Sequence, residues 1–260
     1  MVQPVLPPGG TCAPFVAESG LVVKPLSVQQ CEHEMRMLRL IGIHPNIVTF
    51  VAAASDAKAG ILCFEYGGFD LFKVIEQGGR PDDPRRVLMQ VADALAHVHG
   101  KGVAHRDVKL ENIVQDESGN VRLIDFGLSK AVGDVTLATR DGSLIYMAPE
   151  VTTLCANDAC ASDIWSLGVV LYGIQYGRVP FSPCANERVC ATYRQFSDAA
   201  LAHLNASRRC VHIGILPSIL EPWECTVFDA TWCTDPSARA SAAVIRDRLA
   251  VTDAPLAGTR

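Results

Sequence analysis

The 260-residue sequence predicts an α+β protein of two lobes, with a small β-rich N-terminal lobe that carries one helix and a larger, mainly helical C-terminal lobe. Short apolar or β-branched runs bounded by Gly, Asp or Pro fill the first third of the chain, whereas the part after Ala148 is mostly helical in pattern. No internal repeat or long low-complexity linker interrupts the chain. We therefore expect one compact unit, with the N-terminal lobe over about residues 1–66, a connection over 65–70 and the C-terminal lobe over 71–260.

Three strands and one helix are expected in the first lobe. The strands are predicted over Leu21–Val23, Ile47–Ala53 and Ile61–Phe64. From Gln29 to Leu40 apolar residues recur at helical spacing, and Glu34 lies four residues before Leu38 on the same face. This spacing places a carboxylate at the edge of a core.

The second lobe is predicted to contain two long helices and a hairpin. Asp83 can cap a helix over Pro84–His99, and five apolar residues form its buried stripe. Short strands over Ile113–Val114 and Val121–Ile124 flank the polar stretch DESGN, which is typical of a hairpin. The segment from Asp163 to Tyr176 is apolar on every side, so we expect a helix in the protein interior.

Composition and charge exclude several classes of protein. Hydrophobic residues make up 49% and charged residues 20% of the chain, which is typical of a folded protein. The net charge of −5 disfavours a nucleic-acid-binding surface. The longest apolar stretch, Ile164–Tyr176, is shorter than the ~20 residues of a membrane span, and the N-terminus lacks the pattern of a secretory signal. We expect a cytoplasmic protein, with nuclear access left open, that binds no nucleic acid and spans no membrane.

The ten cysteines are expected to be reduced thiols. They contain no CxxC pair, and several lie inside apolar runs. In a reducing compartment such cysteines act as small apolar side chains. No function is predicted from them.

Two polar strings flank the predicted hairpin. The first runs His-Arg-Asp-Val-Lys-Leu-Glu-Asn and contains Asp107, Lys109 and Asn112, and the second, Asp-Phe-Gly, begins at Asp125. A hairpin brings its two ends together, so these side chains are expected to face one small volume. Carboxylate and amide oxygens suit Mg²⁺, and lysine supplies a compact positive charge, so the pattern indicates a site for magnesium and phosphate.

These strings resemble the H-R-D-x-x-x-x-N catalytic loop and the D-F-G signature of the eukaryotic protein kinases. The family's Ala-Pro-Glu motif follows and ends at Glu150. The string around Trp165 resembles the family's buried helix, and Arg239 stands where the family has an arginine. We interpret these three residues as structural, since burial and an ion pair explain them. The strings KLEN, LIDFGLSK and YMAPEV are closest to the calcium/calmodulin-dependent and AMP-activated branches. The resemblance implies the two-lobed kinase fold, with ATP and Mg²⁺ as cofactors.

The resemblance also implies a role for each polar residue. Asp107 is expected to accept the proton of the substrate hydroxyl, Lys109 to steady the transferred phosphoryl group, and Asn112 and Asp125 to hold metal ions. Because Lys109 follows the aspartate by two residues, the expected acceptors are serine and threonine of protein substrates, with dual specificity less favoured. The implied enzyme is an ATP-dependent serine/threonine protein kinase.

The string from 62 to 72 resembles the family's hinge, which binds adenine. Phe64 would guard the pocket, the backbones of Glu65 and Gly67 would meet the base, and Asp70 would reach the ribose. Lys24 resembles the lysine that contacts the phosphates and pairs with a helix glutamate. Its expected partner is Glu34, ten residues later, and Glu32 is the alternative.

The glycine-rich loop departs from the family pattern. The stretch from Gly9 to Val16 supplies Gly10 and Val16 as the best candidates for contact with ATP, but Ala13 replaces a glycine and Pro14 removes a backbone donor. This departure leaves two further interpretations. One is a pseudokinase or interaction scaffold, and the other is an N-terminal sequence that is incomplete or mispredicted, which would explain the unusual first lobe without altering the function.

Regulation and substrate preference are also implied by the resemblance. Thr139 is the expected phosphosite, with Arg106 receiving its phosphate and an upstream kinase or self-phosphorylation supplying it. Glu111 and Asp70 are expected to select basic residues before the acceptor, because carboxylates pair with arginine.

Overall fold

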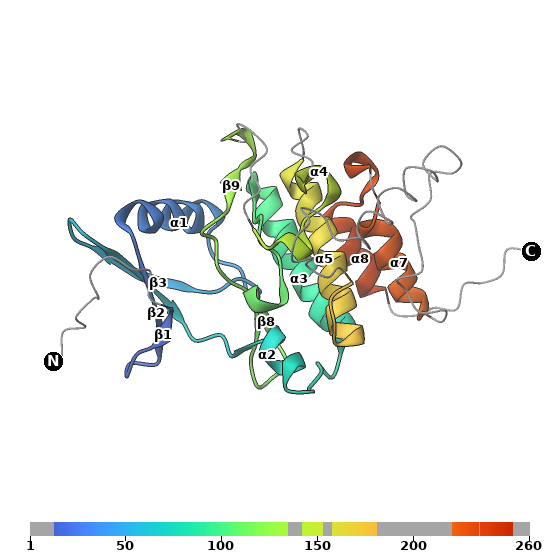
Figure 1. Cartoon of the computed structure of the whole chain (residues 1–260), viewed down its shortest axis with the longest axis horizontal. Coiled ribbons are helices and arrows are strands. Elements are labelled where there is room, and N and C mark those ends of the chain that lie inside the picture. Colours follow the sequence, from blue (N-terminus) through green and yellow to red (C-terminus); the bar gives the residue numbers. More distant parts are fainter. Residues whose placement is uncertain (1–12, 135–141, 153–157, 181–219, 234, 252–260) are drawn as a thin grey trace, which may run out of the picture.

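The computed structural model describes residues 13–134, 142–152, 158–180, 220–233 and 235–251. A β-sheet with one helix forms the N-terminal lobe, and a group of helices forms the C-terminal lobe (Figure 1). The α+β, two-lobed architecture expected from the sequence is therefore confirmed. Gly10 and Thr139 lie outside the described residues, so the predictions made for them stay predictions.

The N-terminal sheet is antiparallel, with the strand order β1-β2-β4-β3. Its strands are β1 (Phe15–Val16), β2 (Leu21–Leu26), β3 (Phe50–Ser55) and β4 (Gly60–Glu65). The register places Lys24 of β2 opposite Leu62 of the central strand β4. Lys24 therefore comes from an inner strand of the sheet, one residue beyond the two that pair with β1.

One strand begins later than the sequence predicts. The apolar run from Ile47 was expected to pair in the sheet, but β3 starts at Phe50, and Ile47 instead forms a parallel bridge with Leu123 of the C-terminal lobe. The amide of Val48 donates to the Leu123 carbonyl at 3.0 Å, and the Leu123 amide donates to the Asn46 carbonyl at 2.8 Å. These bonds join the N-terminal lobe to the predicted hairpin.

Helix α1 (Val28–Ile41) covers one face of the sheet (Figure 1). It begins at a capping box, in which the Ser27 hydroxyl accepts the Gln30 amide and the Gln30 side chain accepts the Ser27 amide. Its buried face carries Cys31, Glu34, Met37, Leu38 and Ile41. The predicted helix is thus confirmed, with its carboxylate turned inward.

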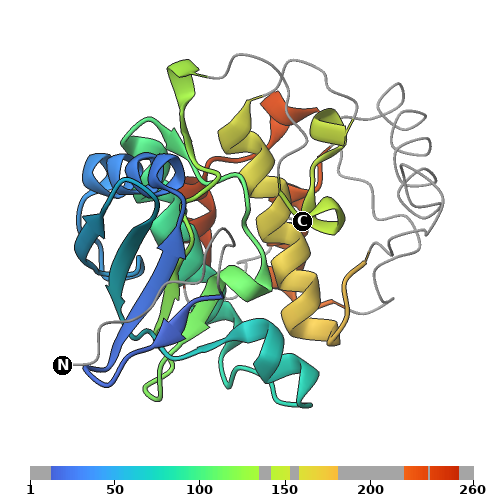
Figure 2. The same ribbon diagram turned by 60° about the vertical axis from the view of Figure 1, so that its left-hand side comes forward.

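The C-terminal lobe is built around α5, which contacts α3 and α7 (Figure 2). Its helices are α2 (Leu71–Glu76), α3 (Pro84–Gly100), α4 (Pro149–Thr152), α5 (Ala159–Tyr176), α7 (Pro222–Thr231) and α8 (Ala242–Ala250). The predicted stripe of α3 is buried, and so is almost all of α5. In the described part of the chain, no helix combines the length and the apolar character needed to cross a membrane.

Two small sheets lie next to the lobe boundary. The strands β5 (Phe69–Asp70), β7 (Ile113–Gln115) and β8 (Val121–Leu123) form one, and β6 (Val103–Ala104) pairs with β9 (Lys130–Ala131) in the other. Short 3₁₀ turns occupy 110–112, 132–134, 144–146 and 236–238. The hairpin β7–β8 is the one predicted from the sequence. Gly68, with φ of +105°, approaches the Gln115 carbonyl so closely that a Cβ would lie 1.9 Å from its oxygen.

A buried ion pair ties the segment after residue 142 to the C-terminal helices. The Arg239 guanidinium donates to both carboxylate oxygens of Glu150 at 2.7 and 2.8 Å and lies over the Trp165 ring, 5.2 Å from its centroid. The two charged residues are each 8% exposed. A bidentate ion pair of this kind holds α4 against α5.

We expect Arg239→Met to lower the free energy of unfolding by about 3–5 kcal/mol, because a buried carboxylate loses its partner. The double variant Glu150→Gln/Arg239→Met should lose less than the single variant, since it leaves no uncompensated charge. Urea denaturation of the three proteins measures both effects. A single variant as stable as the unmodified protein would contradict the structural role of the pair.

Candidate active site

A pocket of 380 Å³ lies between the N-terminal sheet and the β7–β8 hairpin. Its apolar walls are Val16, Val22, Val48, Phe64, Val114 and Ile124. The stretch 65–70 forms one edge, and the polar side chains of Lys24, Glu34 and Asp125 also line the cavity. An apolar slot with a few converging charged groups is typical of a site for a ligand with a flat apolar part and a charged part.

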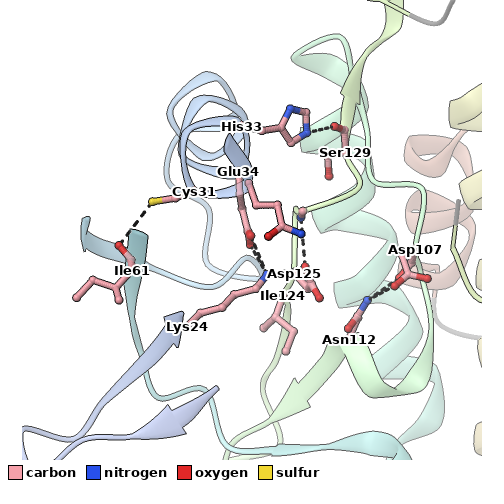
Figure 3. Close-up of polar contacts among 12 residues, drawn as sticks. Lys24, Cys31, His33, Glu34, Ile61, Asp107, Asn112, Ile124, Asp125 and Ser129 are labelled. Atoms are coloured by element: carbon pink, nitrogen blue, oxygen red, sulfur yellow. Dashed lines mark hydrogen bonds and ion pairs between the residues drawn. The ribbon is translucent and has the colours of Figure 1, made fainter. Parts of the chain in front are cut away.

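Lys24 makes two ion pairs in this pocket. Its Nζ donates to Glu34 Oε1 and Oε2 at 2.8 and 2.7 Å and to Asp125 Oδ1 at 2.8 Å (Figure 3). The alternative partner Glu32 is exposed. The interval of ten residues is sufficient because α1 begins at Val28, two residues after β2 ends. The structure thus pairs Lys24 with Glu34.

Neighbouring groups stabilise the charged forms of Lys24 and Asp125. Burial by itself would lower the pKa of Lys24, but the Glu34 and Asp125 carboxylates outweigh it and raise this pKa above its usual value. Burial would likewise raise the pKa of Asp125, but Lys24 and the Gly127 amide, which donates to Oδ1 at 3.2 Å, lower it. Lys24 and Asp125 are therefore ionised at neutral pH.

Asp125 has a backbone conformation that non-glycine residues rarely adopt, with φ of +63°. Such strain persists only where surrounding contacts fix the residue, and it is concentrated at functional sites. The same feature occurs at Arg106, with φ of +70°, directly before Asp107. Both strained residues belong to the strings that the sequence analysis singled out.

Asp107, Lys109 and Asn112 form a second polar group beside the pocket. Lys109 Nζ lies 2.7 Å from Asp107 Oδ2. Asn112 Nδ2 donates to the same oxygen at 3.0 Å and to the Asp107 carbonyl at 2.8 Å (Figure 3). The Ser143 amide donates to Asp107 Oδ1 at 3.0 Å, and Lys109 donates to the Ser143 hydroxyl at 2.9 Å. The Ile124 amide donates to the Asn112 carbonyl at 2.9 Å, which places this group next to Asp125.

Asp163 of α5 anchors the loop that carries Asp107. Its Oδ2 accepts the His105 amide at 2.8 Å, and its Oδ1 accepts the Arg106 amide at 2.7 Å. His99 Nε2 also lies 2.9 Å from Oδ2. Asp163 is 1% exposed, so one buried carboxylate positions the backbone on which Asp107 stands.

The His105 ring connects the two strings. Its Nε2 lies 3.0 Å from the Ile124 carbonyl, and the ring packs edge-on against Phe126 with centroids 4.8 Å apart. His33 of α1 adds a contact from the other lobe, since its Nε2 lies 2.8 Å from the Ser129 carbonyl (Figure 3). The segment around Asp125 is therefore held by both lobes.

The donor set fits a magnesium ion held partly by phosphate. Asp125 offers a partly exposed carboxylate, and because the Asn112 amide nitrogen is used by Asp107, its amide oxygen is the atom suited to a cation. The described residues contain no group of three or more His, Cys, Asp or Glu side chains able to hold a metal. Magnesium takes one or two protein ligands and completes its shell with phosphate and water, so one carboxylate and one amide oxygen are sufficient protein ligands for it.

The structure brings most of the predicted site residues together. Around the pocket lie Val16, Lys24, Glu34, Glu65, Gly67, Asp70 and Asp125, and the group of Asp107, Lys109 and Asn112 lies beside it. The Asp70 carboxylate is engaged by α2, since it accepts the Lys73 amide at 2.8 Å and pairs with the Lys73 ammonium at 3.0 Å.

Sequence reasoning missed two features of the site. The apolar walls formed by Val22, Val48, Val114 and Ile124 were not singled out, although all four lie in strands that the sequence predicts. Asp163 was noted only as part of a buried-helix string. A charged residue at the start of an otherwise apolar helix was the available signal, because a buried carboxylate needs several donors.

Comparisons with known proteins agree with this geometry. The family model of the protein kinase domain matches residues 21–248. The chain is 37% identical over 179 residues to CBL-interacting protein kinase 31 of Oryza sativa subsp. japonica, which covers 66% of this chain and 39% of the relative. It is 38% identical over 179 residues to CBL-interacting serine/threonine-protein kinase 24 of Arabidopsis thaliana, covering 67% and 40%. The matched region spans about two fifths of these relatives.

The anchor at Asp163 gives stability a pH dependence that can be measured. Burial would lower the pKa of His99, but the hydrogen bond to Asp163 and the negative charge of that carboxylate raise it to about 10. Because the folded state binds this proton more tightly, its stabilising effect is complete below the usual histidine pKa of 6.5 and is lost as the pH rises through about 10.

We therefore expect His99→Gln to lower the free energy of unfolding, relative to the unmodified protein, by more at about pH 6 than at about pH 9. This loss should change by at most about 1.4 kcal/mol per pH unit. Glutamine keeps an N–H donor for Asp163 but removes the charge. Urea denaturation at the two pH values measures the difference. An equal difference at both values would show that folding does not raise the pKa of His99.

Proposed function

The chain belongs to the protein kinase family, and on this basis we propose that it transfers the γ-phosphate of ATP, in the presence of Mg²⁺, to serine or threonine hydroxyls of protein substrates. The observation that carries the proposal is the adjacency of two charged groups. The pocket that contains Lys24 and Asp125 lies next to the group of Asp107, Lys109 and Asn112, joined to it by the bond from the Ile124 amide to the Asn112 carbonyl.

The nucleotide would occupy the 380 Å³ pocket. Its base fits between the apolar walls that the two lobes contribute, next to the backbones of Glu65 and Gly67. Asp70, at the same edge, is close enough to the pocket to meet the ribose. Lys24 would bind the phosphates, and its bond to Glu34 would hold the ammonium in place while it does so.

Asp125 and Asn112 would hold Mg²⁺. The bound ion would neutralise charge on the phosphates during transfer. The Asp125 carboxylate, which pairs with Lys24 in this structure, would be a ligand of the cation, and Lys24 would then be available to bind a phosphate oxygen. The low pKa of Asp125 keeps its carboxylate ionised for both partners.

Asp107 would accept the proton of the attacking hydroxyl. Its carboxylate is oriented by the Asn112 amide and the Ser143 amide, which bind different oxygens. Lys109, 2.7 Å from Asp107, places a positive charge where the transferred group would pass. Positioning and charge neutralisation of this kind account for most of the catalysis of phosphoryl transfer.

Serine and threonine are proposed as acceptors because Lys109 follows Asp107 by two residues, as the kinase resemblance requires, and because one of the compared relatives is named a serine/threonine-protein kinase. Glu111 and Asp70 both line the pocket and would favour basic residues before the acceptor. Two relatives are named for an interaction with CBL. Since only about two fifths of each relative is matched, that interaction is not extended to this chain.

We expect Asp107→Asn to lower the rate of γ-phosphate transfer to a mixed panel of Ser/Thr peptides by about 10²–10⁴-fold, because asparagine cannot accept the hydroxyl proton. Asp56→Asn is the matched control, since Asp56 caps an exposed turn between β3 and β4 and should leave the rate unchanged. Transfer of ³²P from ATP measures the rate. Equal rates for Asp107→Asn and the unmodified protein would contradict the role of Asp107, and no transfer by the unmodified protein would favour a scaffold.

We expect Lys24→Met to weaken nucleotide binding by at least about tenfold, since the phosphates lose a cation. Removing Lys24 also leaves Glu34 buried without its ammonium partner, so the double variant Lys24→Met/Glu34→Gln is included to restore stability. Calorimetric titration with ATP and Mg²⁺ measures affinity, and denaturation measures stability. Nucleotide binding that returns in the double variant would show that Lys24 acts only through folding.

A further inference from the structure

Ser129 is a buried residue whose amide, hydroxyl and carbonyl each contact a different part of the chain. It is 0% exposed and directly precedes β9. Its amide donates to the Phe126 carbonyl at 3.2 Å, and its hydroxyl donates to the His105 carbonyl at 3.2 Å. Its own carbonyl accepts a hydrogen bond from His33 of α1, whose Nε2 lies 2.8 Å away (Figure 3). Ser129 therefore joins α1 to the loop that carries Asp107.

The bond from His33 fixes the part of α1 that carries Glu34. A carbonyl can only accept a hydrogen bond, so the half-buried His33 ring carries a proton on Nε2. Glu34 is the next residue of the helix, is 1% exposed and accepts the Lys24 ammonium with both carboxylate oxygens. Any rotation of α1 that moves Glu34 away from Lys24 would also stretch the bond from His33 to Ser129.

The Ser129 hydroxyl acts on the other side, at the peptide unit between His105 and Arg106. The carbonyl of this unit accepts the hydroxyl, and its amide, which belongs to Arg106, donates to Asp163 Oδ1 at 2.7 Å. The orientation of the unit is thus fixed from both sides. It leads into Arg106, whose φ of +70° is strained, and then into Asp107. Loss of the hydroxyl would leave the buried His105 carbonyl without this donor.

The segment between Asp125 and Ser129 passes directly against the ion pair of the pocket. A Cβ placed on Gly127 would lie 3.4 Å from Glu34 Oε2 and 3.8 Å from Lys24 Nζ. The Gly127 amide also donates to Asp125 Oδ1 at 3.2 Å. A shift of this segment would disturb the ion pair and Asp125 together, so the position of Ser129 matters to the pocket as well as to the loop.

We propose that His33 and Ser129 are positioning residues, which hold α1 and the catalytic loop in one fixed relation through the Ser129 carbonyl and hydroxyl. In this arrangement Lys24 is set for the phosphates at the same time as Asp107 is set for the acceptor. The effect on turnover rests on the proposed kinase function, whereas the link between α1 and the loop is a property of the fold. The link transmits a change at α1 to the loop without any contact with nucleotide or substrate.

The link is tested by amide hydrogen exchange in the peptide that contains His105 and Arg106, which requires no kinase activity. His33→Asn should speed this exchange, because asparagine is too short to reach the Ser129 carbonyl. His33→Gln is the matched control, since its amide nitrogen stands as many bonds from Cα as Nε2 does and can replace the donor. We expect the two exchange rates to differ by about three- to tenfold, as for the loss of one hydrogen bond. Equal rates in the two variants would overturn the proposal.

Ser129→Ala separates a transmitted effect from a general loss of stability. It should speed the same exchange by removing the donor to the His105 carbonyl, and adding His33→Asn to it should have little further effect, because the path is already broken. Exchange in α8, which packs against α3 and α7, is the internal reference for global unfolding. Additive effects of the two substitutions, or an equal acceleration in α8, would show that these residues only stabilise the fold.

The consequence for the proposed reaction is measured by ³²P transfer at varied ATP concentration. His33→Asn should lower kcat/KM for ATP by about tenfold, and His33→Gln should restore most of it. Equal kcat/KM values in the two variants would contradict the positioning role. No transfer by the unmodified chain would contradict the proposed function instead, and the exchange measurements would still decide whether the link exists.

Discussion

The arrangement of the site depends on one buried carboxylate. Asp163 lies in α5, an apolar helix that is buried on almost every side, where an ionised group is costly unless several donors satisfy it. His99, His105 and Arg106 supply these donors from two other segments. The helix therefore cannot pack without drawing the loop with Asp107 against it, and the energetic cost of the buried charge fixes the loop backbone, including the strained φ of Arg106.

A second set of contacts joins the loop to the N-terminal lobe. His105 binds the Ile124 carbonyl, and the neighbouring Asp125 pairs with Lys24. Lys24 reaches Asp125 because Glu34 holds it from the other side, and Glu34 is in place because α1 starts at the Ser27 cap directly after β2. The chain of contacts thus runs from a helix cap to a buried carboxylate, and each member is charged or hydrogen-bonded in a way that a neutral substitution would disturb.

Periodicity was enough to predict the parts of the fold that depend on burial alone. The stripe of α3, the apolar α5 and the β7–β8 hairpin follow from spacing, because one face or all faces of these elements meet the core. The strand predicted from Ile47 begins at Phe50 instead, because the apolar pattern of this run does not reveal that Ile47 bridges to Leu123 of the other lobe. The partners of Asp163 and Asp70 could not be predicted, because they come from segments whose approach depends on tertiary packing. The pairing of Lys24 with Glu34 was expected from the kinase resemblance, and the interval of ten residues is sufficient because α1 begins two residues after β2 ends.

The measurement that tests this account most directly separates nucleotide affinity from turnover in Asp163→Asn, with Asp158→Asn as the matched control on the same helix. In Asp163→Asn, the side-chain oxygen can still accept one of the two loop amides, but the side-chain NH₂ group faces the second amide and cannot accept it. In Asp158→Asn, the asparagine still caps α5. The account predicts that turnover falls by about 10²-fold while affinity for ATP with Mg²⁺ is retained, because the pocket is formed by other elements. Full turnover by a folded Asp163→Asn protein would contradict it.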